Sequence, residues 1–330
     1  MKKSNIFQIT PQMKTYNEMK SEWKTFIMNM QKSNFRSEVV NTDAFGLRFN
    51  NQQFKNSVFD NEKKIDQKKI GVIVGSSAAF GIGATKDDFT ISSIMSKNSD
   101  FHYYNLGGRA YCGFQEIILF NSLMGQMKNL NQIIIFSGVN DIFMNNYIAV
   151  YDRILGPMFF TNYFKKAVEL YSLGWKKKLL QFFKDKFLLS RPLKQKIIDN
   201  KFENIKEIIK RNIYCWSTIK KGKNIKLVYF LQPMTNWCKR EISDEEQSLF
   251  KELDRIDSSS NNTLRSLDND LYLKYKFFLK HLCADLDIEF YDCNDYFSQA
   301  RFNKKWLFVD RVHLTDLGYN YISEYIKSKI

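Results

Sequence analysis

Short apolar runs rich in β-branched residues recur along the chain and predict five buried β-strands. They read KIGVIVG, FHYYNL, QIIIFSG, KLVYFLQ and IEFYDC, and they occupy residues 69–75, 101–106, 132–138, 226–232 and 288–293. Segments with helical periodicity separate most of them, for example residues 113–127. Alternating strands and helices build a parallel sheet that is covered on both faces. We therefore predict an α/β fold with a three-layer, doubly wound, five-stranded parallel sheet.

Two segments depart from this alternation and indicate how the chain is divided. Residues 1–68 show no comparable pattern, and we interpret them as an N-terminal extension wrapped on a main domain, residues 69–330. Residues 151–226 form an insertion between the third and fourth strands, where one crossover helix would suffice. Aromatic residues recur at helical spacing within 160–171 and 175–187, which predicts a helical lid or cap.

The end of the chain has the pattern of an amphipathic helix. One helical face of the segment LTDLGYNYISEYIKSKI carries Leu314, Leu317, Tyr321, Ile322, Tyr325 and Ile326. We expect that face to pack on the sheet.

Polar residues suited to catalysis follow the first and third predicted strands. Ser77 comes directly after the strand that ends at Gly75, and Asn140 follows the strand that ends at Gly138. Since the carboxyl ends of parallel strands share one edge of the sheet, we expect these residues to lie at that edge. A serine there can act as a nucleophile, and an amide side chain can donate a hydrogen bond to a developing oxyanion.

Three histidines limit the choice of a general base. His102 falls inside a predicted strand and His281 inside a predicted helix, so we interpret both as structural. His313 follows the last strand region and immediately precedes the final helix, and Asp310 stands three residues before it. Such a carboxylate can accept the Nδ1–H of the imidazole, which fixes the tautomer and stabilises the imidazolium.

Four sequence blocks together resemble the SGNH (GDSL-like) hydrolase superfamily. They are GSSAAFGIG at 75–83, NLGGRA at 105–110 followed by Gln115, GVND at 138–141, and DRVH at 310–313 followed by LTDLG. The resemblance runs from about residue 69 to the end of the chain and implies the flavodoxin-like SGNH hydrolase fold. Two positions depart from the family pattern: Ser76 stands where an Asp usually precedes the nucleophile, and Ala110 stands where a Gly is expected.

The resemblance implies a serine esterase that works through an acyl-enzyme. Ser77 is the implied nucleophile, His313 the base that takes its proton, and Asp310 the acid that orients the imidazole. The expected substrate is an O-acyl ester of a small molecule or glycoconjugate, with a short acyl chain and a sugar as its carrier. Two alternatives stay open, namely an O-acyltransferase with a carbohydrate hydroxyl as acceptor and a catalytically inactive basic binding module.

The same resemblance implies an oxyanion hole at the strand ends. Its donors are the backbone N–H groups of Ser77 and Ala110 and the side-chain amide of Asn140. Gly108 takes the place of Ala110 if the register differs. Arg109, beside this hole, has two interpretations: it binds a carboxylate or phosphate of the substrate, or it forms a salt bridge.

No cofactor and no metal ion are expected. Two pairs of aspartates stand close together in the sequence, Asp268 with Asp270 and Asp292 with Asp295. They lack the glycine and the distal glutamate of a calcium loop, and no His or Cys stands at ligand spacing. We interpret them as helix caps and turn acids.

The positive charge is concentrated in one segment. The chain carries a formal net charge of +15, and residues 151–226 contribute +13 of it, from 19 basic and 6 acidic residues. A basic amphipathic segment favours contact with an anionic membrane surface or an acidic partner. The alternative is a lid whose aromatic residues pack on the main domain. Nucleic acid is not expected as a partner, since no recognised binding motif accompanies the charge.

Cysteine usage and hydropathy bear on the cellular compartment. The five cysteines are odd in number, widely spaced and free of any C-x-x-C pair, which favours free, mostly buried thiols in a reducing compartment. The sequence contains no secretory signal and no apolar run of membrane-spanning length. We expect a cytoplasmic protein, with peripheral attachment to a membrane as the alternative.

Overall fold

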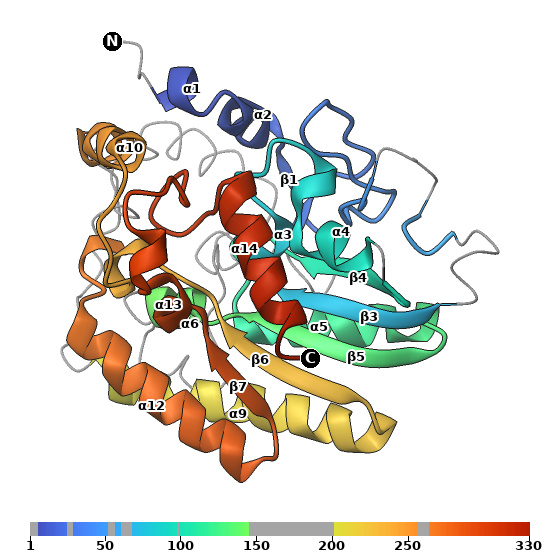
Figure 1. Cartoon of the computed structure of the whole chain (residues 1–330). Helices are drawn as coiled ribbons and strands as arrows, with labels where there is room; N and C mark the ends of the chain where they lie inside the picture. Colours follow the sequence, from blue (N-terminus) through green and yellow to red (C-terminus); the bar gives the residue numbers. More distant parts are fainter. Residues whose placement is uncertain are drawn as a thin grey trace, which may run out of the picture.

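A five-stranded parallel sheet lies at the centre of the computed structural model, which describes residues 6–24, 29–51, 57–60, 68–97, 99–144, 201–255 and 264–330. The strands are β3 (Lys69–Gly75), β4 (Phe101–Gly107), β5 (Leu130–Ser137), β6 (Lys226–Leu231) and β7 (Glu289–Asp292). Their order is β4-β3-β5-β6-β7, and every neighbouring pair is parallel (Figure 1). The predicted fold class is confirmed. The strand order reverses between β3 and β5, so the carboxyl ends of these two strands form the topological switch point.

Both faces of the sheet are buried because the strands are almost wholly apolar. Along β5, Ile133 and Ile135 belong to one hydrophobic core, whereas Ile134 and Phe136 belong to the other. Alternate residues of a strand point to opposite faces, so one apolar run supplies both cores. The first core is covered by α5 (Gly113–Leu123), α9 (Lys201–Lys223) and α12 (Asn269–Asp285). The second is covered by α4 (Ile91–Ser96), α10 (Asp244–Arg255), α13 (Cys293–Phe297) and α14 (Asp316–Lys327).

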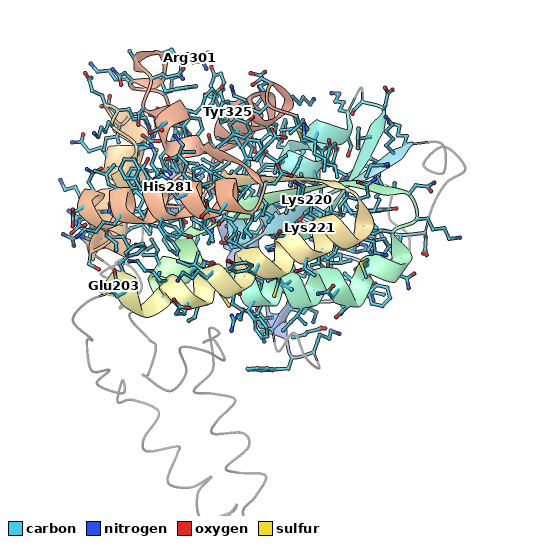
Figure 2. All side chains as sticks on the ribbon, turned by 90° about the horizontal axis from the view of Figure 1, so that it is seen from below. Glu203, Lys220, Lys221, His281, Arg301 and Tyr325 are labelled. Atoms are coloured by element: carbon cyan, nitrogen blue, oxygen red, sulfur yellow. The ribbon has the colours of Figure 1, made fainter. Side chains whose placement is uncertain are left out.

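The crossover from β5 to β6 is completed by helix α9. Its Trp216 is buried in the first core, where its ring meets that of Phe120 at 5.3 Å between centroids. The last turn carries Lys220 and Lys221 at the end of the helix (Figure 2), and Lys220 Nζ lies 2.6 Å from Asp287 Oδ2. The part of the predicted insertion from 201 to 223 is therefore a helix of the main domain. The predicted lid helices within 160–171 and 175–187 lie outside the described residues.

Helix α14 packs on the sheet through most of the predicted face, including Ile322 and Ile326, but Leu317 is wrongly placed in that face and Tyr319 is missing from it. Leu317 is 43% exposed, whereas Tyr319, Ile322 and Ile326 are completely buried. The spacing of these three residues gives the buried stripe its phase, and Leu317 falls beside it. Tyr319 belongs to the stripe because its hydroxyl donates to the carbonyl oxygen of Ile82 at 2.8 Å.

The cysteines agree with the expectation of free, mostly buried thiols. All five cysteines are free; four are buried, and Cys215 is half-buried. No helix within the described ranges is long and apolar enough to cross a membrane.

The N-terminal extension contributes α1 (Ile6–Ile9), α2 (Gln12–Glu18) and the short hairpin β1 (Ser21–Glu22) with β2 (Met30–Gln31). It is joined to the main domain by a buried ion pair, Arg48 with Asp87, in which Nε lies 2.8 Å from Oδ1. The two side chains are 0% and 1% exposed. Burial raises the pKa of Asp87, although the neighbouring guanidinium opposes that rise.

The Arg48–Asp87 pair provides a stability test. We expect Arg48→Met to lower the free energy of unfolding by about 3–5 kcal/mol, because it leaves a buried carboxylate without its partner. Urea denaturation measures the change. Lys14→Met is the matched control in the same extension, since Lys14 and Glu18 are exposed and 3.9 Å apart, and it should cause little change. Equal losses in the two variants would contradict the assignment.

Candidate active site

Ser77 is presented by a sharp turn from strand into helix. Strand β3 ends at Gly75, and α3 (Ser77–Phe80) begins two residues later. A Cβ at Gly75 would lie 2.1 Å from the carbonyl oxygen of Phe136, so only glycine allows β3 and β5 to approach so closely here. Ser77 is consequently the first helical residue beyond the carboxyl end of β3, where its backbone N–H lacks an intrahelical acceptor.

Ser77, His313 and Asp310 form one chain of hydrogen bonds. The Nε2 atom of His313 lies 2.7 Å from Ser77 Oγ, and its Nδ1 atom lies 2.6 Å from Asp310 Oδ2. The other carboxylate oxygen, Asp310 Oδ1, accepts the backbone N–H groups of Val312 at 2.9 Å and His313 at 2.8 Å. Burial by itself would raise the pKa of Asp310, but the His313 charge and these hydrogen bonds lower it. The carboxylate therefore stays ionised beside the imidazole.

The loop that carries His313 is braced by Glu246, which the sequence reasoning missed. Its Oε1 atom accepts the backbone N–H groups of Leu307 and Phe308, each at 2.9 Å, and lies 2.5 Å from Arg240 Nη2. Glu246 also closes a capping box with Ser243 at the start of α10. The S-x-x-E spacing in the sequence could have marked that helix start, but not the contact with the loop.

Arg311 ties the same loop to α10 at a second point. Its Nη2 atom donates to both carboxylate oxygens of Asp254 in α10, at 3.0 and 3.1 Å. Its backbone carbonyl accepts the N–H of Thr235 at 3.0 Å. The chain is thus tied to neighbouring elements just before Asp310 and again at Arg311, which keeps the imidazole in place.

The backbone donor implied at Ala110 lies in a tight turn. The Tyr111 N–H closes this turn on the Gly108 carbonyl at 3.3 Å, and Ala110 has a φ of 60°. The Gly108 N–H already donates to the carbonyl oxygen of Gly75 at 3.0 Å. Among the described residues none accepts the Ala110 N–H, so of the two candidates it is Ala110 that has a donor to offer.

Asn140 lies at the start of α6 (Val139–Met144), directly beyond the carboxyl end of β5. Its Nδ2 atom donates to the carbonyl oxygen of Tyr111 at 2.7 Å. An amide nitrogen carries two protons, so this bond orients the group and leaves a second donor. Ser77, Ala110 and Asn140 therefore follow the ends of β3, β4 and β5, the three neighbouring strands around the switch point.

The Arg109 guanidinium is directed at the N-terminal extension. Its Nη1 atom donates to the carbonyl oxygens of Tyr16 at 3.1 Å and Met19 at 2.6 Å. The structure thus uses this arginine for backbone contacts, where the sequence suggested a substrate anion or a salt bridge.

Ser76, at the position where the family usually has an Asp, takes part in a buried neutral contact. Its Oγ atom donates to Gln232 Oε1 at 3.0 Å, and both side chains are buried. The Gln232 N–H in turn donates to the carbonyl oxygen of Ser137. This pair links the ends of β3, β5 and β6 without a charge.

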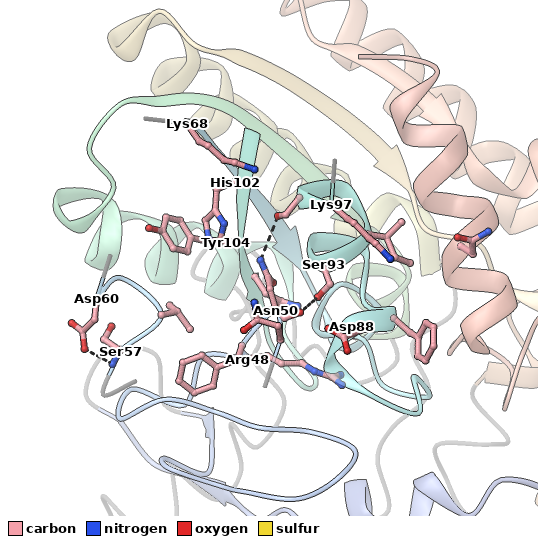
Figure 3. Close-up of a pocket in the computed structure, with 18 residues that line it drawn as sticks. Arg48, Asn50, Ser57, Asp60, Lys68, Asp88, Ser93, Lys97, His102 and Tyr104 are labelled. Carbon is pink, nitrogen blue, oxygen red and sulfur yellow. Dashed lines mark hydrogen bonds between the residues drawn. The ribbon is translucent and has the colours of Figure 1, made fainter. Parts of the chain in front are cut away.

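The other two histidines lie away from this hydrogen-bonded chain. His102 lines a cavity of about 800 Å³ between β4, α4 and the extension, and neither Ser77 nor His313 is among the described residues that line it (Figure 3). Burial, with a smaller contribution from Lys68, lowers the pKa of His102 to about 4, so the ring is neutral. His281 is an exposed residue of α12 (Figure 2).

The close aspartate pairs of the sequence take part in ion pairs and in a helix cap. No cluster of three or more His, Cys, Asp or Glu side chains suited to a metal ion occurs in the described parts of the chain. Asp292 and Asp295, one of the close aspartate pairs, are both bridged by Lys276. Asp268 caps α12 by accepting the Leu271 N–H.

No protein-family model matches the chain, and no curated protein matches it in sequence. Three solved structures resemble it over 79% of its length. An acetyl xylan esterase is 11% identical, with 99% of that chain covered and a TM-score of 0.42. A lipase/acylhydrolase from Enterococcus faecalis is 11% identical, with 95% covered and a TM-score of 0.43. A member of the lipolytic protein G-D-S-L family from Veillonella parvula DSM 2008 is 13% identical, with 100% covered and a TM-score of 0.39.

The backbone at Ala110 leads to a stability prediction. A positive φ costs an alanine about 1–2 kcal/mol in the folded chain. Glycine avoids this cost but gives up more conformational freedom on folding, which offsets part of the gain. We therefore expect Ala110→Gly to raise the free energy of unfolding by about 0.5–1 kcal/mol, measured by urea denaturation. Ala284→Gly in the exposed part of α12 is the control and should lower it by a similar amount. A loss in both variants would show that Ala110 is unstrained.

Asp141, which is half-buried and follows Asn140 in the sequence, lines a small cavity together with the buried Glu116. Asp141 Oδ1 accepts the Gly113 N–H at 2.9 Å, and burial raises the pKa of Asp141 to about 6. Glu116 is buried beside it, accepts the Ser137 hydroxyl at 2.5 Å, and has its pKa raised by burial and then by Asp141. A raised pKa means that the folded protein prefers the protonated carboxyl, so stability is lost as the pH rises through that pKa.

Asp141→Asn should remove part of this pH dependence. Below about pH 4 the variant and the wild type should be similar, because Asp141 is then protonated in the folded and the unfolded chain. Between pH 4 and 7 the wild type should lose about 1–3 kcal/mol relative to the variant. Urea denaturation across this range measures the difference. A flat difference between Asp141→Asn and the wild type across this range would disprove the raised pKa.

Proposed function

We propose that this chain is a serine hydrolase of the SGNH (GDSL-like) type that cleaves carboxylic O-acyl esters. The observation that carries the proposal is the hydrogen-bonded chain from Ser77 through His313 to Asp310 at the carboxyl edge of the sheet. Acyl transfer through a serine requires a nucleophile bonded to a base that is itself bonded to an orienting acid. Here the Ser77 Oγ–His313 Nε2 distance is 2.7 Å and the His313 Nδ1–Asp310 Oδ2 distance is 2.6 Å. The geometry also argues against the catalytically inactive binding module.

In the first half of the reaction, Ser77 Oγ attacks the ester carbonyl carbon while its proton passes to His313 Nε2. Asp310 stabilises the resulting imidazolium, which then protonates the departing alcohol. The carbonyl oxygen becomes an oxyanion, for which the N–H groups of Ser77 and Ala110 and the free amide proton of Asn140 are the donors. The product is an ester between Ser77 and the acyl group.

In the second half, an acceptor hydroxyl takes the acyl group from Ser77. Water as the acceptor gives an esterase, which is the activity proposed here, with a short acyl chain on a sugar or glycoconjugate as its substrate. A carbohydrate hydroxyl in its place would give an O-acyltransferase, since His313 can activate either. We also propose a cytoplasmic location, which the five free thiols support, and contact of the basic segment 151–226 with an anionic membrane or an acidic partner.

A fluorophosphonate probe tests the nucleophile directly. Ser77→Ala should abolish labelling, because the reactive oxygen is gone, and His313→Ala should weaken it by about 10³-fold or more through loss of the base. In-gel fluorescence measures the labelling. Ser76→Ala is the matched control: it removes the neighbouring hydroxyl and its bond to Gln232 but should keep the labelling. Labelling of Ser77→Ala at the wild-type level would refute the proposal.

A panel of p-nitrophenyl esters from acetyl to long-chain acyl groups tests the substrate class. We expect short chains to be preferred, with no turnover by Ser77→Ala. Repeating the assay with added sugars separates the two acceptors. A sugar ester formed at the expense of the free acid would favour the transferase, whereas release of the free acid at every sugar concentration would favour the esterase.

A further inference from the structure

The N-terminal extension contacts the turn that presents the Ala110 N–H from two directions. Both extension carbonyls that Arg109 reaches, those of Tyr16 and Met19, are bound by a single atom of its side chain, Nη1. In the opposite direction, Asn29 Nδ2 of the extension donates to the backbone carbonyl of Arg109 at 3.2 Å. Arg109 immediately precedes Ala110, so its side chain and its backbone are both held by the extension.

A second contact leads from the extension to Asn140. The hydroxyl of Tyr111 donates to Met30 Sδ in β2 at 2.8 Å, and Tyr111 is completely buried. The carbonyl of the same residue orients the Asn140 amide at 2.7 Å. The extension therefore supports two donors of the implied oxyanion hole, the backbone of Ala110 and the side chain of Asn140.

A third contact lies at the end of the helix that starts with Ser77. The Tyr16 hydroxyl and Arg48 Nη1 both bind the Gly81 carbonyl, at 3.0 and 2.8 Å, and Arg48 also reaches the Phe80 carbonyl at 3.2 Å. These carbonyls lie at the C-terminus of α3, where a helix leaves acceptors without intrahelical partners and favours a positive charge. Tyr16 belongs to α2, which lies above α3 in the view of Figure 1.

The strained backbone of Ala110 explains why such support is needed. A non-glycine residue keeps a positive φ only where its surroundings hold it there. The turn has one internal hydrogen bond, from Tyr111 N–H to the Gly108 carbonyl at 3.3 Å, whereas Arg109 alone accounts for three bonds to the extension. The external contacts thus outnumber the internal one.

We propose that the N-terminal extension, in its described parts 6–24 and 29–51, is a working part of the oxyanion hole, and that Arg109 is the positioning residue that connects them. The bonds of its guanidinium to Tyr16 and Met19 fix the turn so that the Ala110 N–H is held where the oxyanion forms. This inference rests on the proposed serine-hydrolase function. It gives the extension a catalytic purpose beyond covering the main domain.

Arg109→Met tests the inference in the full-length chain. It keeps an unbranched side chain, although a shorter one, and removes the nitrogen that makes both bonds. We expect kcat/KM for p-nitrophenyl acetate to fall about 10–100-fold, less than the loss of a whole oxyanion donor. The Ki of a trifluoromethyl ketone, whose serine adduct carries an oxyanion, should rise by the same factor. The Ki of the corresponding secondary alcohol, which forms no adduct, should stay within about twofold.

Two further variants separate positioning from folding. Arg109→Lys should restore most of the activity, because one ammonium can replace the single nitrogen that makes both bonds. Ser37→Ala is the control within the extension: it removes a hydroxyl bonded only to the local backbone of Val39 and Val40 and should leave both Ki values unchanged. If Arg109→Met does not fold, Asn29→Ala removes only the bond to the Arg109 carbonyl and should lower kcat/KM several-fold.

The outcomes distinguish the two proposals. If the wild type shows no ester hydrolysis that is lost in Ser77→Ala, the proposed function itself is refuted. An active wild type whose Arg109→Met variant keeps its kcat/KM, or loses affinity for ketone and alcohol alike, would refute the positioning role alone. The same would follow if Ser37→Ala reproduced the selective loss, since the extension would then act only through its general stability.

Discussion

The hydrogen bond between His313 Nε2 and Ser77 Oγ, at 2.7 Å, is the contact on which the rest of the site depends. It joins two residues that are 236 positions apart, one at the end of the first strand of the sheet and one just before the last helix. Strand β3 places Ser77 at the carboxyl edge of the sheet, but only a fixed loop holds the His313 imidazole within bonding distance of its hydroxyl. The surrounding structure can be understood as the means by which that distance is kept.

Buried charged groups do much of this work. Glu246 with Arg240 binds the chain just before the loop that carries His313, and Arg48 with Asp87 binds the extension to the segment after Ser77. Both arginines also donate to backbone carbonyls, Glu246 accepts three backbone N–H groups and Asp87 accepts that of Asn41, which offsets the cost of removing a charge from water. Breaking a buried ion pair costs much free energy, because it leaves a charge without a partner. These pairs therefore fix loops that apolar contacts alone would allow to shift.

The two departures from the family pattern are accommodated in different ways. Ser76 replaces a carboxylate by a hydroxyl and meets a neutral amide, so that part of the site carries no charge. Ala110 keeps the backbone donor but adds a methyl group where the backbone has a positive φ. Contacts with the extension support that conformation, which connects a change of one residue to a segment far away in the sequence.

The sequence by itself determined the strands of the sheet and the side chains that are candidates for catalysis. Continuous apolar runs identify strands buried on both faces, and the five predicted strands match β3 to β7 within a few residues. Ser77, His313 and Asp310 could be proposed as a triad because four blocks of the sequence resemble those of the SGNH hydrolases. In the last helix Ile322 and Ile326 were predicted correctly, whereas Leu317 was wrong and Tyr319 was missed. Both are plausible core residues, and the contact of Tyr319 with Ile82 decides between them.

Only the tertiary structure decided which groups are free to act. The sequence left open whether Gly108 or Ala110 supplies a donor, and the bond from the Gly108 N–H to Gly75 settles which of them is already engaged. It suggested a substrate anion for Arg109, whereas the fold brings Tyr16 and Met19 to that side chain. A hydrogen bond between distant segments requires donor and acceptor to be placed to within a few tenths of an ångström and in the right direction. No local pattern of residues encodes that placement.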